Sequence, residues 1–111
     1  MTYEVIIIEE ADSDLISLYE YLKHHATKSI AFREIERLET ACMSLQENPE
    51  RGSIPKELPS GGNFNLRQLI VKDFRIFYKV IDNKVLIYGI IHGRRNIRDL
   101  LIRRALLIGK R

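Results

Sequence analysis

Hydrophobic and polar positions divide the chain into two helical stretches set between segments with the pattern of strands. Apolar residues run together in 3–8, which is typical of a buried strand. In 10–25 and in 29–47 they recur every three or four residues, which predicts two amphipathic helices. The joint between the helices is short, so we expect a helical hairpin. Asn48 and Pro49 should end the second helix, because proline disfavours a helical residue before it.

The second half of the chain has the pattern of an antiparallel sheet. Strands are predicted at about 65–71, 74–81 and 84–92, separated by turns of two residues. These elements predict an α+β fold with an N-terminal strand, a two-helix hairpin, a three-stranded antiparallel meander and a C-terminal helix that begins near Asn96. We expect residues 1–111 to form a single domain.

One long segment, 49–64, separates the second helix from the meander. It contains all three prolines and three of the six glycines. A connection of this length inside a compact domain is expected either to serve the function or to be tightly packed.

Two-residue turns would fix the register of the meander, with Val71 paired to Phe74 and Ile81 to Lys84. One face of the sheet is then almost wholly apolar and should carry the helices: Leu69, Val71, Phe74, Ile76, Tyr78, Val80, Val85, Ile87 and Ile91. The other face mixes cations with aromatic and apolar residues: Gln68, Ile70, Arg75, Phe77, Lys79, Leu86, Tyr88, Ile90 and His92. Such a mixed face can bind phosphates and stack bases.

This register places Arg75 between Ile70 and Ile90, on the same face as His92. Arg75 and His92 would be diagonal neighbours roughly 7–8 Å apart at the backbone. Such a pair can serve RNA cleavage, because Arg stabilises developing phosphate charge and His transfers a proton near neutral pH. Alternatively, Arg75 pairs with an acidic neighbour and His92 only ends a strand. Spacing alone favours this second interpretation.

Other residues of the meander also have a structural and a functional interpretation. Arg67 falls on the apolar face, where we expect it to be tied to backbone or to a helix acid. Tyr78 lies on the same face and should be part of the core. Tyr88 lies on the mixed face, where it serves either packing or base stacking, and Lys79 adds a cation there.

Charge is divided unevenly along the chain. Residues 1–50 hold 11 acidic and 4 basic side chains, a net charge of −7, whereas residues 51–111 hold 4 acidic and 14 basic side chains, a net charge of +10. A domain divided in this way is expected to have a basic face that attracts nucleic acid or acidic protein segments. Alternatively, the acidic helices and basic strands neutralise one another.

Composition excludes several classes of protein. Charged residues make up 30% of the chain, and its apolar runs are too short to span a bilayer. No basic segment precedes the first apolar run as a secretory signal requires, so we expect a cytoplasmic protein. Cys42 is the single cysteine and is expected in the core. A single cysteine cannot form an internal disulfide, and the chain has only three histidines besides, so we expect no disulfide, no metal site and no cofactor.

Three segments, 64–69, 73–80 and 85–96, carry a resemblance to a known family. Their order and spacing resemble the central block of the RelE/ParE toxins. In that block an Arg-x-Leu strand is followed by a Tyr-Arg-Ile-x-Tyr strand and by an apolar strand that ends in His and two basic residues. The leading strand and the helical hairpin also match, so the resemblance covers essentially the whole chain.

The resemblance implies the toxin half of a type II toxin–antitoxin pair, of the plasmid-stabilisation kind. RelE-like members cleave messenger RNA in the ribosome, whereas ParE-like members poison DNA gyrase and lack nuclease activity. Many RelE-like members carry a Tyr shortly after the basic pair, but no Tyr follows Tyr88 here. The ending His92-Gly93-Arg94-Arg95 is more similar to the ParE branch.

We therefore expect a ParE-like inhibitor of DNA gyrase that acts through its basic C-terminal half. The residues expected to bind the target are Arg75, Lys79, Tyr88, His92, Arg94, Arg95 and Arg98. One alternative is a ribosome-dependent mRNA endonuclease with Arg75 and His92 as catalytic residues. Another is a non-toxic member that binds only its antitoxin and operator DNA. The expected partners are a cognate acidic antitoxin, gyrase or the ribosome with mRNA, and operator DNA through the antitoxin complex, but no membrane.

Overall fold

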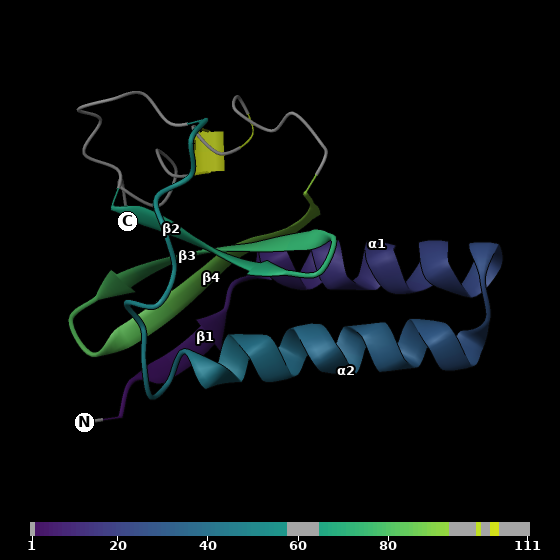
Figure 1. Ribbon diagram of the computed structural model, residues 1–111, viewed down its shortest axis with the longest axis horizontal. Helices are drawn as coiled ribbons and strands as arrows, with labels where there is room; N and C mark the ends of the chain where they lie inside the picture. The colour runs from purple at the N-terminus through teal and green to yellow at the C-terminus, as the bar shows by residue number, and fades with distance from the viewer. Residues whose placement is uncertain (1, 58–64, 94–99, 101–102, 105–111) are drawn as a thin grey trace.

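The computed structural model describes residues 2–57, 65–93, 100, 103 and 104. Its elements follow the predicted order (Figure 1): β1 Glu4–Ile7, α1 Glu9–His25, α2 Lys28–Ser44, β2 Leu66–Val71, β3 Phe74–Ile81 and β4 Lys84–His92. The predicted C-terminal helix lies largely outside the described residues, although 100, 103 and 104 are helical.

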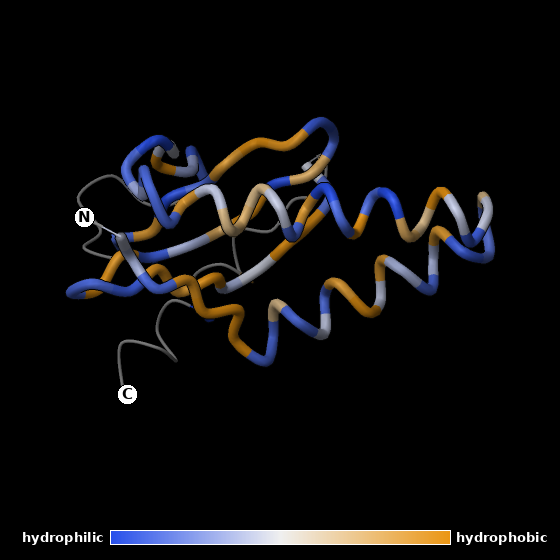
Figure 2. Tube along the Cα trace, turned by 90° about the horizontal axis from the view of Figure 1, so that it is seen from below, coloured by the Kyte–Doolittle hydropathy of each residue, from blue (hydrophilic) through white to orange (hydrophobic). Residues whose placement is uncertain are grey.

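The strands form one sheet in the order β1-β4-β3-β2, with β1 parallel to β4 and the other pairs antiparallel. The two helices lie side by side on one face of the sheet, and their hairpin extends beyond its edge (Figure 1). Hydrophilic and hydrophobic positions alternate along both helices (Figure 2), as the amphipathic pattern predicts. The predicted α+β architecture, with its leading strand, helical hairpin and meander, is thus confirmed.

Local signals explain where the helices begin and end. Acidic residues occupy the first turn of α1 and basic residues its last turn, so both ends complement the helix dipole. The Thr27 side chain caps α2 by accepting a hydrogen bond of 3.1 Å from the backbone N–H of Ile30. This helix ends at Ser44, three residues before the predicted end at residue 47.

The main core lies between the helices and the sheet. Its buried residues are Ala11, Leu15, Leu38, Cys42, Leu45, Leu69, Ile76, Tyr78, Val85, Ile87 and Ile90. A second buried cluster, which we call the outer cluster, lies on the opposite face and consists of Leu66, Phe77, Tyr88 and Ile91. Leu100 packs against it. The predicted mixed face is therefore in large part a second core rather than an open binding surface.

Both turns of the meander have the predicted register, since Val71 pairs with Phe74 and Ile81 with Lys84. The pairing of β3 with β4 nevertheless shifts by one residue within the strands. Phe77 pairs with Gly89. The next residue of β3, Tyr78, pairs with Ile87, so Tyr88 is an extra residue in β4.

This β-bulge reverses the faces of β4 beyond it. Ile90 packs in the main core and Ile91 in the outer cluster, opposite to the prediction. Turn lengths set the register only until a bulge interrupts it, and the one signal for this bulge in the sequence is Gly89, an isolated glycine within the strand beside Tyr88.

Candidate functional site

Arg75 and His92 do not form a common site. Arg75 pairs with Ile70 as predicted, but its other partner is Ile91 rather than Ile90. His92 pairs with Phe74, whose ring it contacts edge-on at a centroid distance of 5.5 Å.

Consecutive residues of a strand project to opposite faces, so Phe74 and Arg75 point to opposite sides of the sheet. Because His92 shares the face of Phe74, the sheet lies between His92 and Arg75. The prediction that Arg75 and His92 converge is therefore wrong. The bulge at Tyr88 is the physical reason, because it moves His92 to the opposite face of the sheet.

Arg75 is held by an acidic neighbour. Its Nη2 lies 2.6 Å from Oε2 of Glu57, and its side chain is 8% exposed. Its Nη1 donates to Oε1 of Gln68 at 3.3 Å, and its guanidinium lies 5.2 Å from the ring centre of Phe77. The hydrogen bond from Arg75 holds the pKa of Glu57 below its ordinary value. The structural interpretation of Arg75 is confirmed, with the acid supplied by the long loop.

Lys79 and Tyr88 also lie beneath the surface. Tyr88 is 1% exposed within the outer cluster. The ammonium of Lys79 lies 5.8 Å from the centre of the Tyr88 ring, and burial lowers the pKa of Lys79. Of the two roles considered for Tyr88, packing is the one that its burial favours.

The first part of the long loop is tightly packed. The hydroxyl of Tyr78 donates to the carbonyl oxygen of Pro49 at 2.7 Å and accepts from the backbone N–H of Gly52 at 3.0 Å. Arg67 donates to the carbonyl oxygen of Gly52 at 3.0 Å. A Cβ atom at position 52 would overlap the Tyr78 hydroxyl and the carbonyl oxygen of Gln68, so glycine is required there. Tyr78 and Arg67 thus have the structural roles predicted for them.

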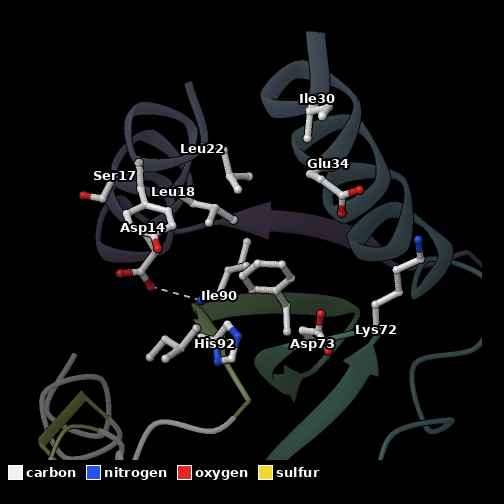
Figure 3. A pocket seen from close by; sticks show the side chains of 13 residues that line it. Asp14, Ser17, Leu18, Leu22, Ile30, Glu34, Lys72, Asp73, Ile90 and His92 are labelled. Atoms are coloured by element: carbon white, nitrogen blue, oxygen red, sulfur yellow. Dashed lines mark hydrogen bonds between the residues drawn. The ribbon is translucent and has the colours of Figure 1, made fainter. Parts of the chain in front are cut away.

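A cavity of about 790 Å³ opens between the helical hairpin and the end of the meander (Figure 3). Both helices contribute side chains to it, and Ile90 and His92 line its floor (Figure 3). Its charged lining is more acidic than basic: Asp14, Glu34 and Asp73 against Lys72, with His92 beside them. The sequence did not predict this cavity.

A further cluster joins α1 to the C-terminal region. Arg104 donates from both terminal nitrogens to the carboxylate of Asp14, at 2.8 and 3.2 Å. Arg104 also donates to the carbonyl oxygen of Tyr88 at 3.0 Å, and Asp14 accepts from the backbone N–H of Ile90 at 3.0 Å. No local signal in the sequence connects Asp14 with a residue 90 positions away.

The other candidate residues, Arg94, Arg95 and Arg98, lie outside the described residues. Within the part of the chain that is described, no group of three or more His, Cys, Asp and Glu side chains could hold a metal ion. None of the described helices is long and apolar enough to span a bilayer.

The leading strand, helical hairpin and bulged meander define an α+β domain of the RelE/ParE type. The chain belongs to the family of ParE toxins of type II toxin–antitoxin systems, whose model matches residues 5–97. It is accordingly a toxin of a type II toxin–antitoxin system. No curated protein matches it.

Three solved structures share the fold. A chain of the chromosomal ParDE system of P. aeruginosa is 17% identical with a TM-score of 0.68, over 82% of this chain and 96% of the other. The free E. coli toxin RelE, as a doubly substituted variant, is 16% identical with a TM-score of 0.60, over 97% and 98%. A chain of the Mycobacterium tuberculosis RelBE2 toxin–antitoxin complex is 20% identical with a TM-score of 0.53, over 83% and 99%.

Proposed function

We propose that this toxin inhibits DNA gyrase by binding to it, without catalysing RNA cleavage. The observation that carries the proposal is the separation of Arg75 and His92 by the sheet. A general acid or base must lie within hydrogen-bond reach of the reacting proton, beside the group that stabilises the developing charge. Two side chains on opposite faces do not meet this requirement.

The environment of Arg75 also supports a non-catalytic function. A phosphate would have to displace Glu57, whose carboxylate lies 2.6 Å from the guanidinium. Breaking a largely buried ion pair leaves an uncompensated charge, which opposes such an exchange. The match to the ParE family model points in the same direction.

The basic C-terminal region is the proposed contact with gyrase. Positions 94–111 contain seven Arg and Lys residues and one acid. Arg104 is bound to Asp14. We assign target contact to Arg94, Arg95 and Arg98, whose charges can act on an acidic protein surface without the geometry that proton transfer requires.

The proposed location in the cell follows from gyrase as the target. Gyrase acts on DNA in the cytoplasm, so the protein would act there as a single domain of residues 1–111.

The ParDE and RelBE2 neighbours come from toxin–antitoxin systems, which supports a cognate antitoxin as the partner that neutralises this toxin. We propose that the antitoxin is acidic and connects the complex to operator DNA.

Growth arrest after induction in bacteria tests the proposal. The comparison is between His92→Gln and the double variant Arg94→Ala with Arg95→Ala. We expect His92→Gln to remain substantially toxic and the double variant to lose most of its toxicity. Thermal unfolding of each purified protein controls for folding.

Two outcomes would reject the proposal. A harmless but folded His92→Gln protein, together with specific mRNA cuts made only by the wild type, would favour the endonuclease. A wild-type protein that causes no arrest at all would favour the non-toxic member that only binds its antitoxin and operator.

A further inference from the structure

Two contacts hold the chain on either side of positions 94–99, which include the three cations assigned to gyrase. Before this segment, the backbone N–H of Gly93 donates to the carbonyl oxygen of Asp73 at 2.7 Å, which ties the end of β4 to the turn between β2 and β3. After it, Arg104 binds Asp14 of α1. The segment is therefore bounded by anchors to two different parts of the domain.

The Asp14–Arg104 anchor is stronger than an ordinary surface ion pair. Both terminal nitrogens of Arg104 bind the carboxylate, at 2.8 and 3.2 Å, and the two side chains are only 15% and 18% exposed. Each partner also binds the backbone of β4, through the carbonyl oxygen of Tyr88 and the N–H of Ile90. A two-pronged pair of this kind fixes geometry, whereas an exposed pair contributes little.

Gly89 makes room for this anchor. A Cβ atom there would lie 2.8 Å from Nη1 of Arg104, closer than a Cβ atom normally approaches another heavy atom. Glycine within a strand often marks such a close approach. Leu100, which precedes Arg104, packs at the same time against the outer cluster. The described C-terminal residues are thus held both at α1 and on the opposite face of the sheet.

We propose that Asp14 and Arg104 are positioning residues for the binding of gyrase. By fixing the chain beyond positions 94–99, the anchor reduces the conformational freedom that these cations lose when they bind. A binding segment restrained in advance binds more tightly for this reason. Ordering even one further residue on association would weaken the complex about tenfold. The inference rests on the proposed function, because it concerns the same cations.

Asp14→Asn separates positioning from charge attraction. The substitution raises the net charge from +3 to +4 and releases the charge of Arg104, so attraction alone would tighten binding to an acidic surface. Asn keeps an acceptor for the N–H of Ile90 but loses the ion pair. Positioning therefore predicts the opposite sign, with binding about tenfold weaker than that of the wild type.

The matched control is Glu20→Gln on the same helix. It makes the same change of charge, but Glu20 is 52% exposed and pairs with Lys23 at the surface, 3.5 Å away. Its dissociation constant should stay within about twofold of the wild-type value. Fluorescence anisotropy of labelled toxin, titrated with purified gyrase, measures these constants, and thermal unfolding of each variant shows that the assay temperature lies below its midpoint.

Gly89→Ala repeats the test without any change of charge, and it replaces Asp14→Asn if that variant does not fold. The added Cβ atom would displace Arg104, so binding to gyrase should weaken by a similar factor. Wild-type affinity in both variants, or tighter binding by Asp14→Asn, would overturn the proposal.

A double-mutant cycle distinguishes positioning from a general loss of stability. In the background of Arg94→Ala with Arg95→Ala, measured at low salt, Asp14→Asn should weaken binding by less than about threefold, because most of the cations that it positions are gone. A merely structural role would give the same factor in both backgrounds, which would also overturn the proposal.

The wild type separates this inference from the proposed function. Wild-type toxin that does not bind gyrase would reject the proposed function and the inference with it. Wild-type toxin that binds gyrase no more tightly than Asp14→Asn and Gly89→Ala would overturn the positioning role alone.

Discussion

Replacing Tyr78 by Phe tests how the long loop is anchored to the sheet. The Tyr78 side chain is fully buried, and its hydroxyl joins two backbone groups of the loop: the carbonyl oxygen of Pro49 and the N–H of Gly52. Phe keeps the ring and its packing but removes both hydrogen bonds. The variant therefore measures the anchoring alone.

The expected loss of stability follows from these two bonds. Each contributes about 0.5–1.5 kcal/mol net, and a buried group that loses its partner costs more, so we expect Tyr78→Phe to destabilise by about 1–3 kcal/mol. With an unfolding entropy of about 2.1 cal/mol/K per residue, each kcal/mol lowers Tm by roughly 4 °C in a chain of 111 residues. Tm should thus fall by about 4–13 °C.

Thermal and urea unfolding measure this loss, with Tyr21→Phe as the matched control. Tyr21 is 57% exposed, so its substitution should change stability by less than about 0.5 kcal/mol. Burial raises the pKa of Tyr78 above its ordinary value of 10.0. The corresponding stabilisation is complete below pH 10 and is lost at higher pH, so the gap between wild type and Tyr78→Phe should narrow there. Equal midpoints for Tyr78→Phe and Tyr21→Phe would refute the anchoring role.

Three further results are expected. Leu38→Ala should destabilise by about 2–5 kcal/mol because Leu38 is buried mid-helix, whereas Phe32→Ala on the exposed side of the same helix should change little in urea unfolding. Glu57→Ala should cost about 1.5–3 kcal/mol near neutral pH. Since the pKa of Glu57 is lowered from 4.5, this difference should disappear as pH falls below that value, and a difference constant down to strong acid would contradict the pairing. Stopped-flow association with the antitoxin should slow as salt is raised, and a salt-independent rate would argue against electrostatic attraction.

Much of the fold could be predicted because local periodicity determines it. The apolar spacing located both helices, and the two-residue turns set the pairing of Val71 with Phe74 and of Ile81 with Lys84. Strand alternation assigned Tyr78 to the core, where it is buried. Such predictions hold wherever one side chain after another follows the regular period of its element.

The candidate site was less predictable because it depends on one irregular residue and on distant contacts. The extra residue Tyr88 places His92 on the other face from Arg75, and the isolated glycine beside it, Gly89, is compatible with a bulge but does not fix its position. The partners of Arg75 and Asp14 come from segments far along the chain. Charge counts showed a basic C-terminal half but not which cations were already paired.

The central claim is that the toxin acts on gyrase by binding rather than on RNA by catalysis. Supercoiling of relaxed plasmid by purified gyrase, measured over a series of toxin concentrations, tests it most directly. The account predicts dose-dependent inhibition by the wild type and nearly equal inhibition by His92→Gln. The sheet separates His92 from Arg75, so the proposed inhibition does not depend on proton transfer by His92. Full supercoiling in a large excess of folded wild-type toxin would contradict it.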